Sequence, residues 1–226
     1  MTVYSFLKRL IDFLVALAAL LVLAVPLLVI MVALRFTGEG EVFYKQDRIG
    51  YRNSTFGIWK FATMLKNSPN MGTGSLTVRG DPRVTTVGRI LRATKINEVP
   101  QLINVLTGDM SFVGPRPQMH VDFDIYPEHV RDTIYSVRPG VTGIGSIVFR
   151  DEERLLSQPG VDPRAFYEEK IAPYKGALEM WYLEHKSLWT DLRLLVLTVV
   201  VVFAPESGIA YRVFPDLPPK PKWLHV

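Results

Sequence analysis

The longest apolar run of the chain lies close to its N-terminus. Residues 13–34 include no charged side chain. As an α-helix they would measure about 33 Å, at 1.5 Å per residue, which is enough to cross the hydrocarbon core of a bilayer. A run that is apolar on every face is typical of a membrane helix, because a helix of a soluble protein usually has a polar face. A cleaved signal peptide is disfavoured, since no small-x-small cleavage site follows before Arg35.

Pro26 lies near the middle of this run and predicts a kink. A proline removes one helical hydrogen bond and clashes with the carbonyl one turn earlier. Basic residues stand on both sides of the run, Lys8 and Arg9 before it and Arg35 after it, which fits poorly with placing one flank outside the cell. A broken helix that enters and leaves on the same face explains both features. The sequence therefore favours a re-entrant hairpin over residues 1–40, with a straight span as the alternative.

Charge and cysteine content narrow the choice of partner. A formal net charge of +4 indicates an anionic partner, which could be nucleic acid, an acidic membrane surface or a phosphorylated substrate. The mean hydropathy of +0.17 favours a membrane, and no nucleic-acid-binding motif is recognisable, so we expect no nucleic acid. The absence of cysteine excludes disulfides and thiolate metal sites. The histidines are scattered without ligand spacing, so a zinc or iron site is not expected.

A cationic stretch in the middle of the chain precedes a second helix. Arg89, Arg92 and Lys95 recur at every third position, so on a helix they would share one face. Asn97 is a good N-cap for the helix that follows, and Glu98 places a carboxylate at the junction. A helix N-terminus flanked by guanidinium groups is a natural anion site. The alternative is a basic, solvated helix face followed by a packed helix.

Short strands are expected before this stretch. Residues 42–50 read as a strand and turn, and residues 56–64 as a second strand. Lys60 alternates with apolar neighbours and could line a phosphate site, although a solvent-facing lysine is the commoner case. Residues 67–80 should form a mobile loop, in which Gly72-Thr73-Gly74 is only a weak phosphate-loop signal.

Two further arginines are candidate ligands of a phosphate or nucleotide. Arg138 lies in a turn-rich segment that follows a helix expected over residues 122–135, and Arg150 precedes a run of acidic residues. The alternative for both is ion pairing with neighbouring acids at the surface.

Aromatic residues cluster in the C-terminal third, around two helical stretches that Pro173 should separate. Residues 192–204 are strongly apolar but too short for an ordinary membrane span. Together with the aromatic residues they suggest helices lying in the headgroup layer, and a packed core helix is the alternative. The proline-rich tail over residues 214–222 should be extended.

Several motifs, in this order along the chain, resemble the bacterial sugar transferase family, the small monotopic phosphoglycosyl transferases. The resemblance covers nearly the whole chain. Its most specific part is the run Gly108-Asp109-Met110-Ser111-x-Val113-Gly114-Pro115-Arg116-Pro117. The shorter motifs are Lys8-Arg9 with Asp12 before the apolar segment, Gln46-Asp47-Arg48-Ile49-Gly50, Lys60-Phe61-x-Thr63-Met64, Asp81-Pro82-Arg83, Glu98-x-Pro100-Gln101-Leu102-x-Asn104-Val105-Leu106 and Arg138-Pro139-Gly140-Val141-Thr142-Gly143.

The resemblance implies an α+β fold, with a mainly helical membrane-associated domain, a small β element and an N-terminal re-entrant membrane helix. The implied organisation is a re-entrant hairpin over residues 1–40, a cytoplasmic catalytic domain over 41–190, and an interfacial amphipathic helix with an extended tail over 191–226. The implied location is the bacterial inner (cytoplasmic) membrane, with the catalytic domain on its cytoplasmic face.

The implied activity is transfer of a phosphosugar from a nucleotide diphosphate sugar, expected to be a UDP-sugar, to polyprenol phosphate. A nucleoside monophosphate is released, Mg²⁺ is the cofactor, and the reaction is the first membrane step of surface glycan assembly. The implied partners are the sugar donor, the lipid acceptor and membrane lipids, and a homodimer is one option. The residues expected at the site are Glu98, Asn97 and Arg92 for catalysis, Glu98 and Asp109 for the metal, and Lys60, Arg89, Arg116, Arg138 and Arg150 for the substrates.

Asn97 departs from the family pattern. The usual catalytic pair is Asp-Glu, in which the Asp is the nucleophile of a covalent mechanism, and here the pair is Asn97-Glu98. An amide cannot serve as a carboxylate nucleophile. Three alternatives follow: Glu98 takes over the attack, the acceptor attacks directly, or the chain is catalytically impaired and acts as a membrane scaffold for glycan enzymes.

Overall fold

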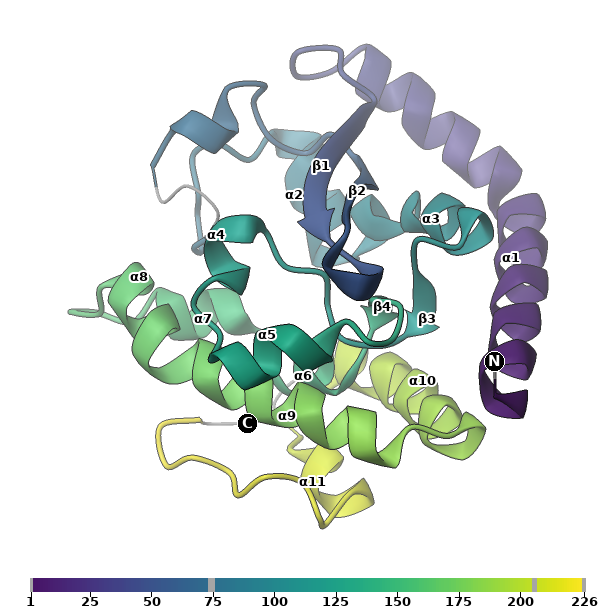
Figure 1. The fold of residues 1–226 in the computed structure, drawn as a ribbon. Coiled ribbons are helices and arrows are strands. Elements are labelled where there is room, and N and C mark those ends of the chain that lie inside the picture. Colours follow the sequence, from purple (N-terminus) through teal and green to yellow (C-terminus); the bar gives the residue numbers. More distant parts are fainter. Residues whose placement is uncertain (1, 73–75, 205–206, 225–226) are drawn as a thin grey trace.

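The computed structural model describes residues 2–72, 76–204 and 207–224. Helices predominate in these ranges, and four short strands form two small sheets (Figure 1). The expected α+β class, mainly helical with a small β element, is confirmed. The helices are α1 (Val3–Arg35), α2 (Thr86–Ala93), α3 (Gln101–Thr107), α4 (His120–Phe123), α5 (Glu128–Ile134), α6 (Ile144–Val148), α7 (Glu152–Leu156), α8 (Pro163–Phe166), α9 (Ala172–His185), α10 (Leu188–Phe203) and α11 (Ile209–Val213). The strands are β1 (Phe43–Ile49), β2 (Thr55–Phe61), β3 (Ser111–Val113) and β4 (Gly140–Thr142).

Helix α1 is 33 residues long and lies along the edge of the molecule (Figure 1). It is the one helix in the described ranges that is long and apolar enough to cross a membrane. The helix is bent in Figure 1, in agreement with the predicted kink, but it is not interrupted at Pro26. The broken hairpin expected from the sequence is therefore a bent, continuous helix, because a proline removes only one of many helical hydrogen bonds. That both ends lie on the same side of a membrane stays a prediction.

Polar contacts and apolar packing attach α1 to the rest of the domain. Arg9 donates hydrogen bonds to the carbonyls of Val105 and Leu106, at the C-terminal end of α3. A guanidinium at this end satisfies carbonyls that have no partner inside the helix and interacts favourably with the helix dipole. Lys8 forms an ion pair with the buried Asp191 of α10, with 2.8 Å between Nζ and Oδ2.

Both strands predicted before the cationic stretch are confirmed, and the structure shows that they pair. Strands β1 and β2 form an antiparallel hairpin in which Phe43 lies opposite Phe61 and Ile49 opposite Thr55. The rings of Phe43 and Phe61 stack with centroids 5.5 Å apart, a cross-strand pair of the kind that stabilises small sheets.

Strands β3 and β4 are parallel, and their ends approach backbone to backbone. A Cβ atom on Gly114 would overlap the carbonyl oxygen of Arg138, and one on Gly140 would overlap the backbone nitrogen of Gly114. Both positions therefore require glycine. This close contact fixes the Gly114–Pro117 segment, which leads directly into the candidate site.

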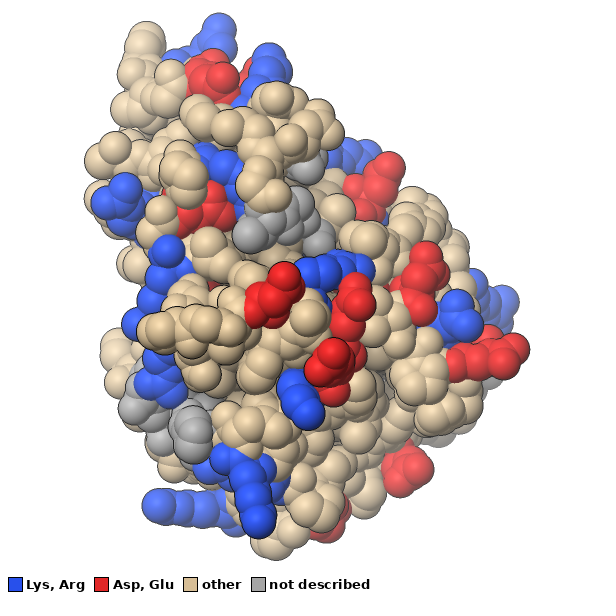
Figure 2. Space-filling model, turned by 90° about the vertical axis from the view of Figure 1, so that its left-hand side faces the viewer, with Lys and Arg blue, Asp and Glu red and all other residues tan. Residues whose placement is uncertain are grey.

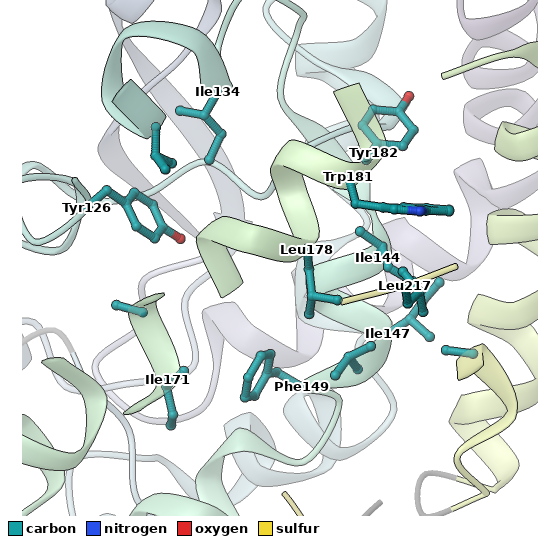
Figure 3. Packing of buried hydrophobic residues seen from close by; sticks show 14 of the residues in the cluster. Tyr126, Ile134, Ile144, Ile147, Phe149, Ile171, Leu178, Trp181, Tyr182 and Leu217 are labelled. Carbon is teal, nitrogen blue, oxygen red and sulfur yellow. The ribbon is translucent and has the colours of Figure 1, made fainter. Parts of the chain in front are cut away.

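The largest core cluster surrounds α9. Figure 3 shows Leu178 and Trp181 of α9 next to Ile144 and Ile147 of α6, and all four are less than 9% exposed. Burying each aliphatic side chain of this size contributes about 1.5–3 kcal/mol. A second cluster, which includes Ala16 of α1, joins that helix to α3 and β2. The core thus places α3, the β-hairpin and α6 around a common space.

Two sequence predictions about helices and one about the C-terminal tail need correction. The helix expected over 122–135 is divided into α4 and α5, because Pro127 disfavours helical geometry at the residue before it. The break expected at Pro173 is absent: a π-helical turn, Tyr167–Ile171, continues into α9, and Pro173 occupies the first turn, where its missing N–H is tolerated. The tail after α11 is packed and turn-containing, since Phe214 and Leu217 are buried.

Helix α10 has two different apolar faces. Leu194, Leu197 and Val201 are buried against the domain, while Val199 and Phe203 are 60% and 85% exposed. The core interpretation therefore holds for one face of the helix, and that the other face lies in the headgroup layer stays a prediction.

Candidate functional site

A cavity of about 1260 Å³ opens between the β-hairpin, α2, α6 and α7. It brings together most of the side chains expected at the site, although they come from segments far apart in the sequence. Those that line it are Lys60, Arg89, Arg92, Asn97, Glu98, Arg116 and Arg150. The loop containing Thr73 and Gly74, the weak phosphate-loop signal, lies partly outside the described residues.

The ion pair between Glu98 and Arg116 is the central contact of the cavity. Arg116 Nη2 lies 2.8 Å from Glu98 Oε1, and the Glu98 side chain is only 14% exposed. Prolines on both sides restrict the backbone of Arg116. The hydroxyl of Tyr135 also donates to the Arg116 carbonyl at 2.8 Å. The guanidinium is thus held in place by its own backbone as well as by the carboxylate.

The charge of Glu98 is strongly stabilised. Burial raises the pKa of its carboxyl group, but the positive charges of Arg116, Lys60 and Lys95 outweigh burial and leave the pKa well below the usual range. Glu98 is therefore ionised at neutral pH, and its basicity is low.

The other charges of the cavity are mainly positive and repel one another. Burial and the like charge of Arg48 lower the pKa of Lys60 well below its usual range, against the attraction of Glu98. Burial and the charge of Arg116 lower the pKa of Arg48 to about 10. Groups that are already poorly stabilised as cations would gain from a bound polyanion. The cavity is therefore suited to a ligand with several negative charges, such as a pyrophosphate.

The face of the molecule shown in Figure 2 is not distinctly cationic, in contrast to the cavity. Figure 2 shows one face of the molecule, on which acidic and basic side chains are intermingled without a continuous basic patch. This distribution favours a small anionic ligand over a long polyanion such as nucleic acid.

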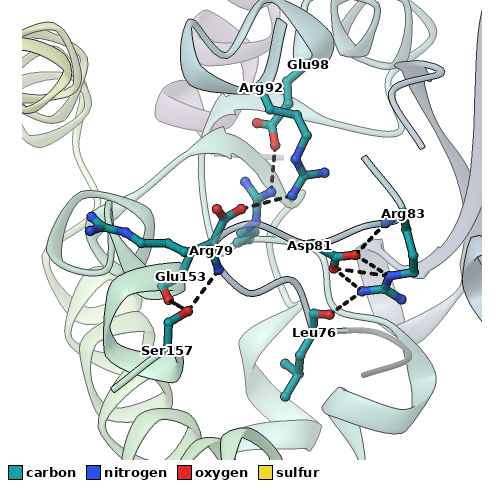
Figure 4. A network of polar contacts seen from close by, with 9 residues as sticks. Leu76, Arg79, Asp81, Arg83, Arg92, Glu98, Glu153 and Ser157 are labelled. Carbon is teal, nitrogen blue, oxygen red and sulfur yellow. Dashed lines mark hydrogen bonds and ion pairs between the residues drawn. The ribbon is translucent and has the colours of Figure 1, made fainter. Parts of the chain in front are cut away.

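Arg92 and Arg89 extend from α2 toward the cavity. Arg92 is the last basic residue of that helix and forms an ion pair with Glu153 of α7, with 3.0 Å between Nη2 and Oε1 (Figure 4). Arg89 is exposed, one turn earlier. Because the Arg92–Glu153 pair is itself partly exposed, an anionic ligand could replace the carboxylate at low cost.

The sequence predicted that Asn97 is the N-cap of α3, but in the structure it is not. Lys95 adopts a left-handed conformation with φ of 60°, which ends α2 and turns the chain into a short 3₁₀ helix, Ile96–Glu98. Helix α3 begins afterwards, with Pro100 at its N-cap position. Asn97 is only 5% exposed, and its Oδ1 atom has no hydrogen-bond partner among the described residues. A buried, unpaired oxygen thus belongs to the residue before Glu98, and both residues line the cavity.

These two residues offer a limited set of metal ligands. Within the described residues no three acidic or histidine side chains come close enough to form a metal site by themselves. Glu98 supplies one carboxylate, and Asn97 supplies an amide oxygen that lacks a partner. Mg²⁺ usually binds one or two carboxylates and completes its shell with water and substrate phosphates. The donor set therefore fits Mg²⁺ when a phosphorylated substrate is present.

Asp109 and Arg138 lie outside this cavity, at the other end of α3. The Thr107 hydroxyl donates to Asp109 at 2.8 Å, and Arg138 donates to the Gly108 carbonyl at 2.7 Å. Both side chains therefore support the turn after α3. Glu98 precedes that helix and Asp109 follows it, so the structure does not bring the two expected metal ligands together, nor Arg138 to the other substrate contacts.

The sequence interpretation missed two kinds of residue. Arg48 lines the cavity from β1, and its alternation with Gln46 on the strand was an available signal. Arg83 is 2% exposed and lies in the cavity wall. It forms an ion pair with Asp81 and donates hydrogen bonds to the carbonyls of Leu76 (Figure 4) and Ser68. Nothing in a local pattern indicates that an arginine is buried.

A family model described as "Bacterial sugar transferase" matches residues 3–205. A UDP-glucose:undecaprenyl-phosphate glucose-1-phosphate transferase from Caulobacter vibrioides is 37% identical over 206 residues, which cover 89% of this chain and 71% of that protein. A UDP-N-acetylgalactosamine-undecaprenyl-phosphate N-acetylgalactosaminephosphotransferase from Aeromonas hydrophila is 32% identical over 199 residues, 87% of this chain and 44% of that protein. The exopolysaccharide production protein ExoY from Sinorhizobium fredii is 31% identical over 209 residues, 86% and 84% of the two chains.

The chain thus spans less than half of the Aeromonas relative but most of the Sinorhizobium one. Because the family model matches nearly its whole length, the chain belongs to the bacterial sugar transferase family.

Proposed function

We propose that the protein transfers a phosphosugar from a UDP-sugar to polyprenol phosphate and releases UMP, as the first membrane step of surface glycan assembly. The observation that supports this most directly is the cavity in which the Glu98–Arg116 pair is surrounded by Lys60, Arg92 and Arg150. The names of the relatives supply the substrate classes, since two of them are transferases that act on undecaprenyl phosphate.

The reaction exchanges one phosphoanhydride bond for another at the phosphorus that bears the sugar, and the ester bond to the sugar stays intact. A new P–O bond forms to this phosphorus, the bond to the UMP oxygen breaks, and the electron pair leaves with UMP. Negative charge increases on the leaving phosphate as that bond breaks. Fixed guanidinium groups such as Arg116 and Arg92 stabilise this charge without reorganising at the moment of reaction.

Mg²⁺ is the proposed cofactor, held by Glu98 and the Asn97 amide oxygen together with substrate phosphates. When bound, it would neutralise pyrophosphate charge and orient the reacting phosphorus. Arg116 keeps Glu98 ionised, as a metal ligand must be. Asp109 is not proposed as a ligand, because it lies beyond the far end of α3.

The acceptor must reach this site from a membrane, and the arrangement of α1 and α10 supports such a path. The outer faces of both helices are apolar and exposed. The cavity also extends to Leu23 of α1 and Val202 of α10. A polyprenol chain could therefore lie between these helices with its phosphate among the basic side chains. We place the protein at the bacterial inner membrane, with this cavity on the cytoplasmic side where UDP-sugars are available.

The alternative, an inactive scaffold, depends on Asn97 alone. Glu98, Arg116 and the other cationic residues of the cavity are all in place, and the relatives are named as transferases. A homodimer remains a separate prediction that light scattering of the detergent-solubilised protein would test.

A reconstituted assay tests the proposed function. Purified protein, Mg²⁺ and undecaprenyl phosphate are mixed with a panel of UDP-sugars, and UMP and the lipid-linked sugar are both quantified. We expect equal amounts of the two products with at least one donor, and neither product with Glu98→Gln. Release of UMP without lipid product would mean hydrolysis, and no product with any donor would contradict the proposal.

A further inference from the structure

Glu179 is a carboxylate in the core of the domain that the reaction above does not use. It lies on α9 and is only 1% exposed. Neither of its carboxylate oxygens has a partner at good hydrogen-bond geometry among the described residues, and the backbone N–H groups of Arg116 and Gly145 stabilise its charge only in part. Burying an unpaired carboxylate is unfavourable, and an apolar residue would pack there at less cost. The position therefore calls for a role other than packing.

The Glu179 carboxylate faces the backbone that leads to Arg116. On that side the backbone N–H groups of Arg116 and Gly145 interact with the carboxylate and lower its pKa, against the effect of burial. A Cβ atom on Gly145 would overlap Glu179 Oε1, so the carboxylate occupies the space that this glycine leaves open. Glu179 is thus wedged between the Gly114–Pro117 segment and the start of α6.

Tyr135 holds the same segment on the other side. Its hydroxyl donates to the Arg116 carbonyl at 2.8 Å and accepts from the Gln118 backbone N–H at 2.9 Å. The N–H group of Arg116 therefore faces Glu179, while its carbonyl group is bound to Tyr135.

We propose that Glu179 is a positioning residue for Arg116: with Tyr135, it fixes the Arg116 backbone so that the guanidinium stays on Glu98 in the cavity. This inference rests on the function proposed above for its consequence in catalysis, but the positioning itself can be measured independently.

The protonation state of Glu179 follows from its surroundings. Burial raises the pKa of its carboxyl group to about 8, although the N–H of Arg116 and the charges of Lys175 and Arg116 act in the opposite direction. Lys175 forms an ion pair with Glu152, with 2.5 Å between Nζ and Oε2, and this pair largely compensates the Lys175 charge. The titratable groups that face the site from the side of α5 are Tyr126 and Tyr135, and burial keeps both neutral by raising their pKa values.

Glu179 is therefore neutral at pH 7 and ionised at pH 9. In the ionised form it competes with Glu98 for the positive charge of Arg116 and should displace that side chain. With a pKa near 8, only about one molecule in ten keeps the neutral form at pH 9. The active fraction should fall about tenfold between pH 7 and pH 9, and Glu179→Gln, which imitates the neutral acid, should remove this fall.

Hydrogen exchange and kinetics test the inference on the full-length protein. Glu179→Ala and Tyr135→Phe should increase amide exchange in peptides covering residues 113–118 and lower kcat more than they raise KM for UDP-glucose or whichever UDP-sugar is active. Glu179→Gln should keep wild-type exchange and kcat at pH 7. The matched control is Glu184→Gln, an exposed glutamate on the same helix, which should change nothing.

The outcomes separate this inference from the proposed function. If the wild type transfers no phosphosugar, the proposed function fails, and the exchange data alone decide whether Glu179 positions Arg116. Wild-type exchange over residues 113–118 in Glu179→Ala would overturn the inference. If Glu179→Ala does not fold, an alkaline decline of the same size in the wild type and Glu179→Gln would overturn it instead.

Discussion

The Arg116 guanidinium and the Glu98 carboxylate form an ion pair in the cavity, at 2.8 Å, and each depends on the other. Glu98 gives Arg116 a counter-charge in a region crowded with cations. Arg116 in turn is the largest of the favourable influences that keep the Glu98 pKa low. The two residues belong to separate motifs, and the close contact of Gly114 with the β4 segment is what brings the second motif to the first.

Replacing Arg116 should abolish most activity without unfolding the protein. In Arg116→Ala the loss of a fixed donor should lower kcat by about 100-fold or more, since single preorganised donors have effects of this size. Without the Arg116 charge, the pKa of Glu98 should also rise. As the pH is lowered, the remaining activity should therefore decline at a higher pH than the activity of the wild type. The measurement is kcat as a function of pH in the UMP-release assay.

Arg212→Ala is the matched control for this prediction. Arg212 is exposed on α11 and does not line the cavity, so its loss should leave kcat unchanged. Turnover of Arg116→Ala close to the wild-type value would remove Arg116 from the site.

Local sequence patterns predicted the elements of this fold but not all of their contacts. Apolar residues and turn residues correctly placed strands β1 and β2, and the apolar run correctly placed α1. The N-cap assigned to Asn97 was wrong because the left-handed Lys95 inserts a 3₁₀ turn between α2 and α3. Such a turn depends on the packing of both helices, which no window of a few residues contains.

The candidate site, too, could be predicted only in part from local sequence, because some of its contacts depend on the tertiary fold. Glu98 and Arg116 belong to motifs of the family, so their presence at the site could be anticipated, and both line the cavity. Asp109 was expected to bind the metal together with Glu98, yet the length of α3 separates the two residues. Arg92 contacts Glu153, which is 61 positions away in the sequence, and only the tertiary fold determines this contact.

The buried ion pair of Arg83 and Asp81 should be important for stability. Both side chains are 3% exposed, and Arg83 also donates to backbone carbonyls of the loop that begins near Ser68. Arg83→Met would leave Asp81 charged and buried without its partner, which should reduce the free energy of unfolding by about 3–5 kcal/mol. Thermal unfolding of the purified variant, with Arg212→Ala as control, measures this, and an unchanged Tm would show that the pair is dispensable.

Both ends of α1 should face the cytoplasm. The bend of α1 and the basic residues on both of its flanks favour this topology over a crossing. Because the chain has no cysteine, single cysteines at Thr2 and at the exposed Glu128 of the catalytic domain can be labelled in intact cells with an impermeant reagent. Thr2 caps α1 through its hydroxyl. Replacing it by cysteine should reduce the stability of the helix by about 1 kcal/mol, which a long helix tolerates.

We expect neither cysteine to react until the cells are permeabilised. Labelling at Thr2 but not at Glu128 in intact cells would mean that α1 crosses the membrane and would contradict the re-entrant arrangement.

The Asn97–Glu98 pair should determine the route of transfer. Glu98→Gln removes the carboxylate charge at constant size and should abolish activity, whether that charge binds the metal or attacks the donor. Asn97→Asp should retain activity or raise it, because it supplies a carboxylate to the pocket where Oδ1 of Asn97 lacks a partner. Two adjacent carboxylates repel and would raise each other's pKa, but the cations that surround Glu98 should keep both ionised.

Incubation with a radiolabelled UDP-sugar in the absence of acceptor distinguishes the routes. Glu98 is a weak nucleophile, because the charges that lower its pKa also lower its basicity. We therefore expect the wild type to turn over without a trapped phosphosugar adduct, by direct attack of polyprenol phosphate, and Asn97→Asp to accumulate one on the new carboxylate. An adduct on Glu98 of the wild type would instead assign the attack to that residue. Full activity of Glu98→Gln would exclude both routes and move the search to another carboxylate of the cavity.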